Sequence, residues 1–83
     1  SLALELAGEN ITVNAVVPGV FATELNRRLL DDPELERAFT EKIPIGRLGE
    51  PRELAPLVIY MVSEEAAYMT GSIVVLDGGY MAL

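Results

Sequence analysis

Two short runs of β-branched and aliphatic residues most constrain what this chain can fold into. Residues 10–17 read NITVNAVV and residues 72–76 read SIVVL. Nearly continuous apolar runs of this kind are typical of strands in a parallel sheet that is covered on both faces. Parallel strands need a long crossover, usually helical, to bring the chain back to the same end of the sheet. The sequence therefore predicts an α/β fold with two parallel strands and helices between them.

The segment after the first run predicts two short helices. Pro18 and Gly19 mark the end of the first strand, and Thr23 is a plausible N-cap for a helix that reaches about residue 28. Asp32, followed by a proline, predicts a second helix over residues 33–42. Its apolar stripe has helical spacing and consists of Leu35, Ala38, Phe39 and Ile43. Two short helices between turn residues favour a mobile surface flap.

Two further helices are predicted at the start of the chain and before the second strand. Residues 1–7 are helix formers that Gly8 should stop, and they form either the tail of a longer helix or a frayed terminal helix. Residues 51–62 predict a helix that Pro56 should either delay or bend, because proline lacks an N–H donor. The order helix, strand, helices, strand gives only two strands, which make a poor sheet by themselves.

Composition narrows how such a chain can be stabilised. Its 83 residues fit one small domain, but with no Cys and no His it has neither a disulfide nor a zinc site to support a thin core. The chain is therefore expected to be a piece of a larger α/β domain, or to associate. It begins at Ser1 without Met, which suggests an interior segment, a processed product or an incomplete chain.

Charge and hydropathy exclude several partners. The net charge of −7 disfavours nucleic-acid binding, because phosphates would be repelled. No apolar run approaches the roughly 18 residues that a membrane span requires, and no secretory signal pattern is present. The absence of Cys fits the cytoplasm.

An ordered set of short motifs resembles the C-terminal part of a short-chain dehydrogenase/reductase. The first is Asn14-Ala15-Val16-Val17-Pro18-Gly19 followed by Thr23, and the later ones are Arg47-Leu48-Gly49-Glu50-Pro51, Thr70-Gly71 and Asp77-Gly78-Gly79. Each motif is weak alone, but together they cover almost all of the chain. The resemblance implies that residues 1–83 are the C-terminal segment of one NAD(P)-binding domain, built on a doubly wound parallel, Rossmann-like sheet. It also implies that the rest of that domain precedes Ser1.

The resemblance further implies the nature of the site. The cofactor would be NAD or NADP, and the residues that hold its nicotinamide end would be Pro18, Gly19, Val20, Phe21 and Thr23. The Phe21 main chain would contact the carboxamide, and the Thr23 hydroxyl would bind the carboxamide or a phosphate. From the residues alone, this segment is an ordinary strand-ending turn with a helix cap. The substrate would be a small carbonyl compound or alcohol, bound under a flap that includes Asn26, Arg27, Leu29, Leu30 and Phe39, and the assembly a homodimer or homotetramer.

The chain does not contain the family's catalytic groups. No Tyr is followed four residues later by Lys, the seven glycines form no phosphate loop, and the only lysine, Lys42, is expected to be solvated. Asn14, Arg47 and Asp77 are expected to hold structure through hydrogen bonds rather than to act in catalysis. We therefore expect a portion of an NAD(P)-dependent oxidoreductase with no catalytic and no metal residues of its own. The alternatives are a non-catalytic, self-associating interaction module and, by chance resemblance, an unrelated small α/β domain.

Overall fold

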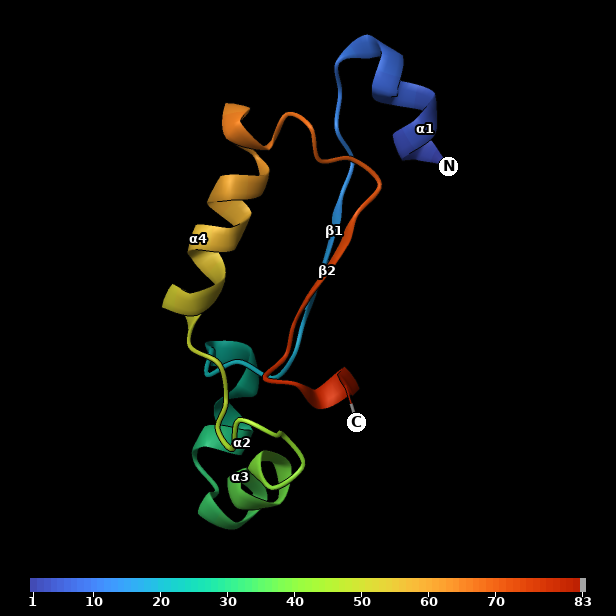
Figure 1. Ribbon diagram of the computed structural model, residues 1–83. Helices are drawn as coiled ribbons and strands as arrows, with labels where there is room; N and C mark the ends of the chain where they lie inside the picture. The colour runs from blue at the N-terminus through green and yellow to red at the C-terminus, as the bar shows by residue number, and fades with distance from the viewer. Residues whose placement is uncertain (83) are drawn as a thin grey trace.

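The computed structural model describes residues 1–82, arranged as a narrow body of 50 × 25 × 18 Å (Figure 1). Helices, 3₁₀ turns (η) and strands alternate along it. In chain order the elements are α1 (Leu2–Leu6), η1 (Ala7–Glu9), β1 (Ala15–Pro18), η2 (Glu24–Asn26), α2 (Arg27–Leu30), α3 (Pro33–Thr40), α4 (Pro51–Met61), η3 (Glu64–Ala66), β2 (Ile73–Leu76) and η4 (Tyr80–Ala82).

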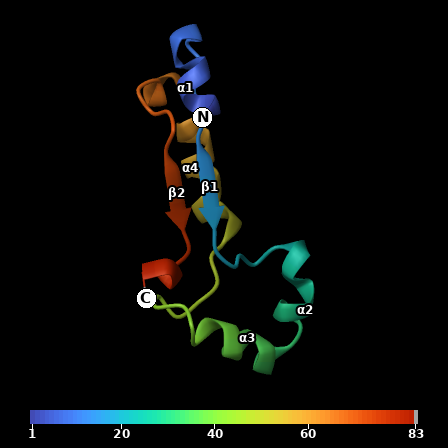
Figure 2. The same cartoon turned by 90° about the vertical axis from the view of Figure 1, so that its right-hand side faces the viewer.

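β1 and β2 form a two-stranded parallel sheet, as the two apolar runs predict (Figures 1 and 2). The register pairs Ala15 with Ile73 and Pro18 with Leu76. Both strands begin later than the runs, and side-chain hydrogen bonds of Asn14 join the two segments just before the strands. Its amide donates to the Met69 carbonyl at 3.0 Å and its oxygen accepts the Ser72 N–H at 3.0 Å. The expected structural role of Asn14 is confirmed.

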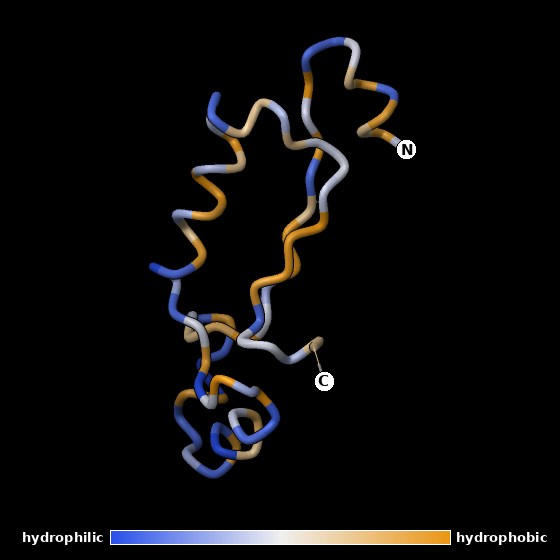
Figure 3. The backbone as a smooth tube through the Cα atoms, in the orientation of Figure 1, coloured by the Kyte–Doolittle hydropathy of each residue, from blue (hydrophilic) through white to orange (hydrophobic). Residues whose placement is uncertain are grey.

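One face of this sheet is not covered by residues 1–82, and the other is only half-buried. Ile73 is 72% exposed and Val75 is 42% exposed, although Figure 3 shows the paired strands as the most continuous apolar stretch of the backbone. α4 runs beside the sheet, while α1 lies at its far end (Figure 1). The prediction of strands buried on both faces is therefore wrong for these residues alone, because they supply too few helices to form two layers.

Helix ends follow local hydrogen bonding more than residue propensity. Asp32 caps α3 as predicted, since its Oδ1 accepts the N–H groups of Glu34 and Leu35 at 3.2 Å each. Gly8 does not stop the first helix. The chain continues through η1 to Asn10, which adopts the left-handed conformation (φ 62°) and donates its N–H to Ala7.

α4 begins at Pro51 and contains Pro56 in its interior. The prediction that Pro56 could delay the start of this helix is wrong. The helix starts at Pro51 because a proline at the first helical position costs no hydrogen bond, and Pro56 is accommodated within the helix. No helix within residues 1–82 is long and apolar enough to cross a bilayer.

The main packed cluster lies beyond the carboxyl ends of the strands. Leu29 from α2, and Ile43 and Leu48 from the connector to α4, are each 6–7% exposed and pack together. Val20 and Ala22, on the chain leaving β1, pack against this cluster. α2, the connector before α4 and the exit of β1 are thereby held as one unit.

Candidate functional site

A cavity of about 440 Å³ lies where the two strands end. We call it the strand-end cavity. It is bounded by the exit of β1, by the end of α3 and the residues after it, and by the turn after β2. Its lining residues are Val17, Pro18, Gly19, Val20, Phe39, Lys42, Ile43, Asp77, Tyr80 and Met81. Open α/β sheets bind ligands in a crevice at the carboxyl ends of their strands, so this is the expected place for a ligand.

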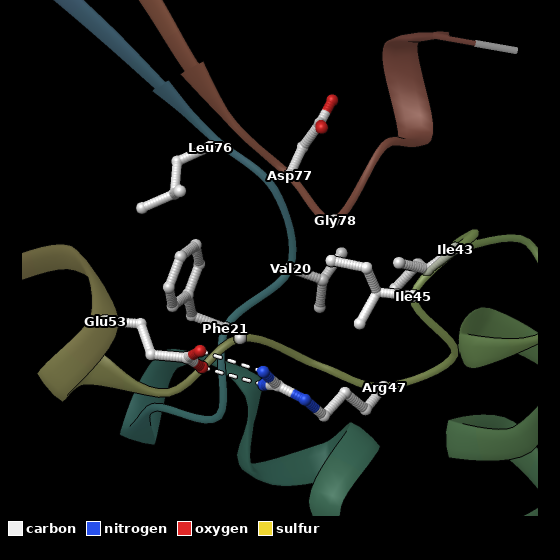
Figure 4. A pocket seen from close by; sticks show the side chains of 10 residues that line it. Val20, Phe21, Ile43, Ile45, Arg47, Glu53, Leu76, Asp77 and Gly78 are labelled. Atoms are coloured by element: carbon white, nitrogen blue, oxygen red, sulfur yellow. Dashed lines mark hydrogen bonds and ion pairs between the residues drawn. The ribbon is translucent and has the colours of Figure 1, made fainter.

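The structure divides the five predicted cofactor residues among three environments. Pro18, Gly19 and Val20 line the strand-end cavity. Phe21 lines, together with Val20, a neighbouring small pocket of about 80 Å³ (Figure 4). Thr23 lines neither. Contact between these residues and a cofactor stays a prediction. Of the five, the three at the exit of β1 border the strand-end cavity.

Gly19 lies too close to the other strand exit for a larger residue to fit. A Cβ at this position would lie 2.8 Å from the Asp77 Cα and 2.9 Å from its Cβ. The Gly19 N–H also donates to the Leu76 carbonyl at 2.9 Å, which extends the ladder beyond β1. The family resemblance places Gly19 among the residues that would hold the nicotinamide, and the structure shows that Gly19 is also where the two strand exits approach closely.

Phe21 fixes the β1 exit against the connector that precedes α4. Phe21 is 7% exposed. Its ring lies so close to Gly49 that a Cβ added to Gly49 would be 2.6 Å from a ring carbon. Two backbone hydrogen bonds flank the ring, from Ala22 N–H to the Gly49 carbonyl at 2.8 Å and from Gly49 N–H to the Val20 carbonyl at 3.0 Å. The main chain that would meet a nicotinamide is thus rigidly placed.

The polar groups of the Phe21 main chain are in different states. Its carbonyl accepts the Thr23 N–H at 2.9 Å and the Asn26 side-chain amide at 2.5 Å. Its N–H has no acceptor among residues 1–82. Sequence reasoning assigned Asn26 only to the flap and missed this contact, although Asn side chains commonly bond nearby backbone at helix starts.

Thr23 occupies the N-cap position of η2, but its side chain accepts no hydrogen bond from that turn's backbone. The prediction of a Thr23 side-chain cap is therefore wrong. Its hydroxyl oxygen instead lies 3.5 Å from the Asn26 amide nitrogen. Since only this long contact involves it within residues 1–82, the hydroxyl can still serve a ligand.

Arg47 and Glu53 form a bidentate ion pair at the small pocket that Phe21 lines, drawn with dashed lines in Figure 4. The guanidinium nitrogens lie 2.7 and 2.8 Å from the two carboxylate oxygens. The hydrogen bond from Arg47, followed by the one from the Glu50 N–H, lowers the pKa of Glu53 from 4.5 to about 2. Arg47 also donates to the Leu48 carbonyl at 3.1 Å, which confirms its predicted structural role.

Asp77 holds the turn after β2, also as predicted. Its two carboxylate oxygens accept the N–H groups of Gly79 and Met81, each at 2.9 Å. Figure 4 shows this carboxylate turned away from the Phe21 ring. Within residues 1–82 no group of three or more acidic, His or Cys side chains is placed to hold a metal ion.

Comparison with known proteins relates this arrangement to one family. The family model described as enoyl-(acyl carrier protein) reductase matches residues 1–81. Galactitol 2-dehydrogenase (L-tagatose-forming) of Cereibacter sphaeroides is 42% identical over 80 residues, which are 96% of this chain and 32% of that protein. The chain thus spans about a third of the length of the curated relatives it matches.

Solved structures show the same relation in three dimensions. A short-chain dehydrogenase family protein of Francisella tularensis superposes with a TM-score of 0.90 at 36% identity, over 99% of this chain and 38% of its own. A putative 2-deoxy-D-gluconate 3-dehydrogenase of Agrobacterium tumefaciens with bound NADP gives 0.90 and 36% over 99% and 33%. These matches place the parallel pair and its helices in a Rossmann-like sheet, and the chain belongs to the short-chain dehydrogenase/reductase family, through the family model described as enoyl-(acyl carrier protein) reductase.

Proposed function

We propose that this chain is the C-terminal portion of an NAD(P)-dependent oxidoreductase that interconverts a carbonyl compound and an alcohol. In this role it supplies the loop on the nicotinamide side of the cofactor and the flap over the substrate. The observation that carries the proposal is the strand-end cavity, because three of the five predicted cofactor residues, Pro18, Gly19 and Val20, line it. Its volume of about 440 Å³ lies within the range of roughly 300–1,000 Å³ for small-molecule sites.

The polar groups at the β1 exit suit the carboxamide of a nicotinamide. The Phe21 N–H, which has no acceptor in residues 1–82, would donate to the carboxamide oxygen. The Thr23 hydroxyl would accept from the carboxamide nitrogen or donate to a phosphate. The Phe21 carbonyl would become an acceptor for the cofactor when the Asn26 amide leaves it.

The bound cofactor would supply the hydride chemistry, and these residues would hold and orient its ring. Holding a reactant in one geometry is itself a large part of catalysis, because it removes the entropy cost of alignment from the reaction step. Burial of Phe21 and its two flanking backbone hydrogen bonds make the loop a stiff support. The catalytic Tyr and Lys and the phosphate loop would lie in another part of the protein.

The relatives support an oxidoreductase more than the alternative of a non-catalytic interaction module. The Cereibacter relative is named as a galactitol 2-dehydrogenase that forms L-tagatose, and the Agrobacterium structure contains NADP. For this protein we propose small carbonyl and alcohol substrates, either NAD or NADP, and a homodimer or homotetramer. The uncovered faces of α4 and β2 are compatible with such an assembly.

Cofactor binding by the complete protein tests the proposal. Intact mass and NADH and NADPH binding, followed by fluorescence, are measured on the same sample, for the complete protein and for the 83-residue chain. We expect binding only by the complete protein.

In the complete protein, Thr23→Ala should raise the dissociation constant for the cofactor about 2- to 10-fold through loss of one hydrogen bond. Thr40→Ala removes a hydroxyl whose one hydrogen bond within residues 1–82 is to the Arg37 carbonyl, and it should leave binding unchanged. No binding by the complete protein, or tight binding by the 83-residue chain alone, would overturn the proposal.

A further inference from the structure

Lys42 brings a positive charge to a cavity whose lining is mostly apolar. It is the only one of the six basic residues that lines the strand-end cavity. It follows α3 in the chain, where its N–H donates to the Phe39 carbonyl at 3.1 Å. Its flexible four-carbon stem lets the ammonium reach into the cavity or toward solvent.

The charge of Lys42 is not used inside the chain. Three arginines, Arg27, Arg47 and Arg52, each form ion pairs with acidic neighbours at 2.6–2.7 Å. Within residues 1–82 the Lys42 side chain has no ion pair and no hydrogen bond, in a sequence whose net charge is −7. An ammonium left unpaired among so many carboxylates has its hydrogen-bonding capacity available for a ligand.

The one carboxylate in the cavity lining, that of Asp77, forms no ion pair with Lys42 within residues 1–82. Both Asp77 oxygens accept backbone N–H groups at 2.9 Å, so this side chain already has partners in its own turn. The other polar lining group is the Tyr80 hydroxyl, which can both donate and accept. The remaining lining is aliphatic or aromatic, and such a surface favours the body of an apolar ligand.

We propose that the substrate of this enzyme carries an anionic group, a carboxylate or a phosphate, at the end of an apolar body, and that Lys42 binds that group. The inference rests on the proposed function and adds to it a substrate class and a specificity-determining residue. The nicotinamide side of the cavity is formed by the β1 exit, and Lys42 lies on the part formed by the end of α3. A substrate that spans the cavity would place its reactive carbon toward the first and its anionic end toward the second.

Three probes of equal chain length test this directly: octanoate, octyl phosphate and octanol. Their binding to the complete protein is measured by titration calorimetry, with and without NADH or NADPH. We expect at least one anion to bind about 10-fold more tightly than octanol, because a charge-assisted hydrogen bond is gained. The tighter of the two anions identifies the group. Lys42→Met should remove this preference and change octanol binding less than 2-fold, while Lys42→Arg should keep most of it.

Arg37→Met is the matched control, because Arg37 on α3 also has no ion pair within residues 1–82 but does not line the cavity. It changes net charge by the same amount and should not alter the preference. Equal affinity for anions and octanol, an anion preference that survives Lys42→Met, or no binding of any probe would overturn the inference. Anion binding through Lys42 in a protein that binds no cofactor would keep the inference for the cavity and overturn the oxidoreductase proposal. Cofactor binding without a preference for anions would keep the oxidoreductase proposal and overturn the inference about Lys42.

Discussion

The two ends of this molecule differ in how completely the chain packs its own residues. At the carboxyl ends of the strands, Leu29, Ile43 and Leu48 are each 6–7% exposed and form a cluster. Along the sheet and α4, by contrast, Ile73 is 72% and Ile59 is 65% exposed. The site end is therefore packed by contacts within the chain, whereas the sheet end presents apolar surface that residues 1–82 do not cover.

The size of the uncovered surface supports this comparison. The exposed area is 6306 Å² for a chain of 9.0 kDa, whereas a folded monomer of that mass exposes about 4,850 Å². The radius of gyration is 15.8 Å, against about 12 Å for a compact domain of this length. Residues 1–82 therefore expose more surface and are less compact than a folded monomer of this size.

The largest predicted effect concerns the chain taken alone. As a monomer, the 83-residue polypeptide should show no cooperative unfolding transition, because the exposed sheet faces give too little burial to offset the loss of chain entropy. Calorimetry and sedimentation on the isolated chain check this, with the complete protein as control. A sharp two-state transition from a monomeric species would show that the sheet end needs no further cover.

Next in size is truncation of the aromatic ring that fixes the site end. In the complete protein, Phe21→Ala should lower the free energy of unfolding by about 3–5 kcal/mol, as expected for a buried Phe. Phe39→Ala is the matched control. Phe39 is 44% exposed at the cavity, and its loss should cost about 1 kcal/mol. Urea denaturation measures both, and similar losses would contradict the assignment of Phe21 as the packed ring.

A smaller effect should come from the point where the two ends meet. Gly19→Ala would place a Cβ 2.8 Å from backbone of Asp77, and the forced separation of the strand exits should cost about 1–3 kcal/mol. Gly8→Ala is its control, since nothing lies within 4 Å of a Cβ there and alanine suits helical backbone. If the two variants were equally stable, the close approach at Gly19 would not be a feature of the protein in solution.

Features set by adjacent residues were predictable from the sequence. The Asp32 cap on α3 and the Asp77 turn follow from short patterns, and the structure contains them. The parallel pairing of the strands was predicted from their apolar runs, but the partners of the Asn14 side chain, Met69 and Ser72, were not. Contacts between distant segments were not predictable. Nothing near Gly19 in the sequence shows that Asp77 lies against it, and nothing near Asn10 requires a left-handed residue there rather than at Gly8.

The candidate site shows the same division. The motif around Pro18 and Gly19 predicted that the site lies at the end of the first strand, because the residues that end a strand are adjacent in the sequence. That Lys42 and Tyr80 line the same cavity depends on how α3 and the turn after β2 fold toward β1, which no local pattern shows. Lys42 was predicted only to be solvated. It is exposed, and it also borders the cavity.

The smallest predicted effect is a pH dependence from the ion pair at the start of α4. The folded-state pKa of Glu53 is about 2 against an ordinary 4.5, so its contribution to stability is fully present above about pH 4.5 and is lost as the pH falls toward 2. Glu53→Gln should therefore be less stable than wild type above pH 4.5, and the difference should shrink between pH 4.5 and 2. Urea midpoints of the complete protein across this range measure it.

Glu9→Gln supplies the control for that pH series, because Glu9 forms no ion pair among residues 1–82 and its substitution removes the same charge. Its urea midpoint should follow wild type at every pH. Arg47→Met should reproduce the effect of Glu53→Gln, since the hydrogen bond from Arg47 is the main cause of the lowered pKa. If Arg47→Met left the wild-type pH dependence intact, the Arg47–Glu53 ion pair would not join the connector to α4 in solution. The small pocket lined by Phe21 would then be held only by the Phe21 ring and the two backbone hydrogen bonds beside it.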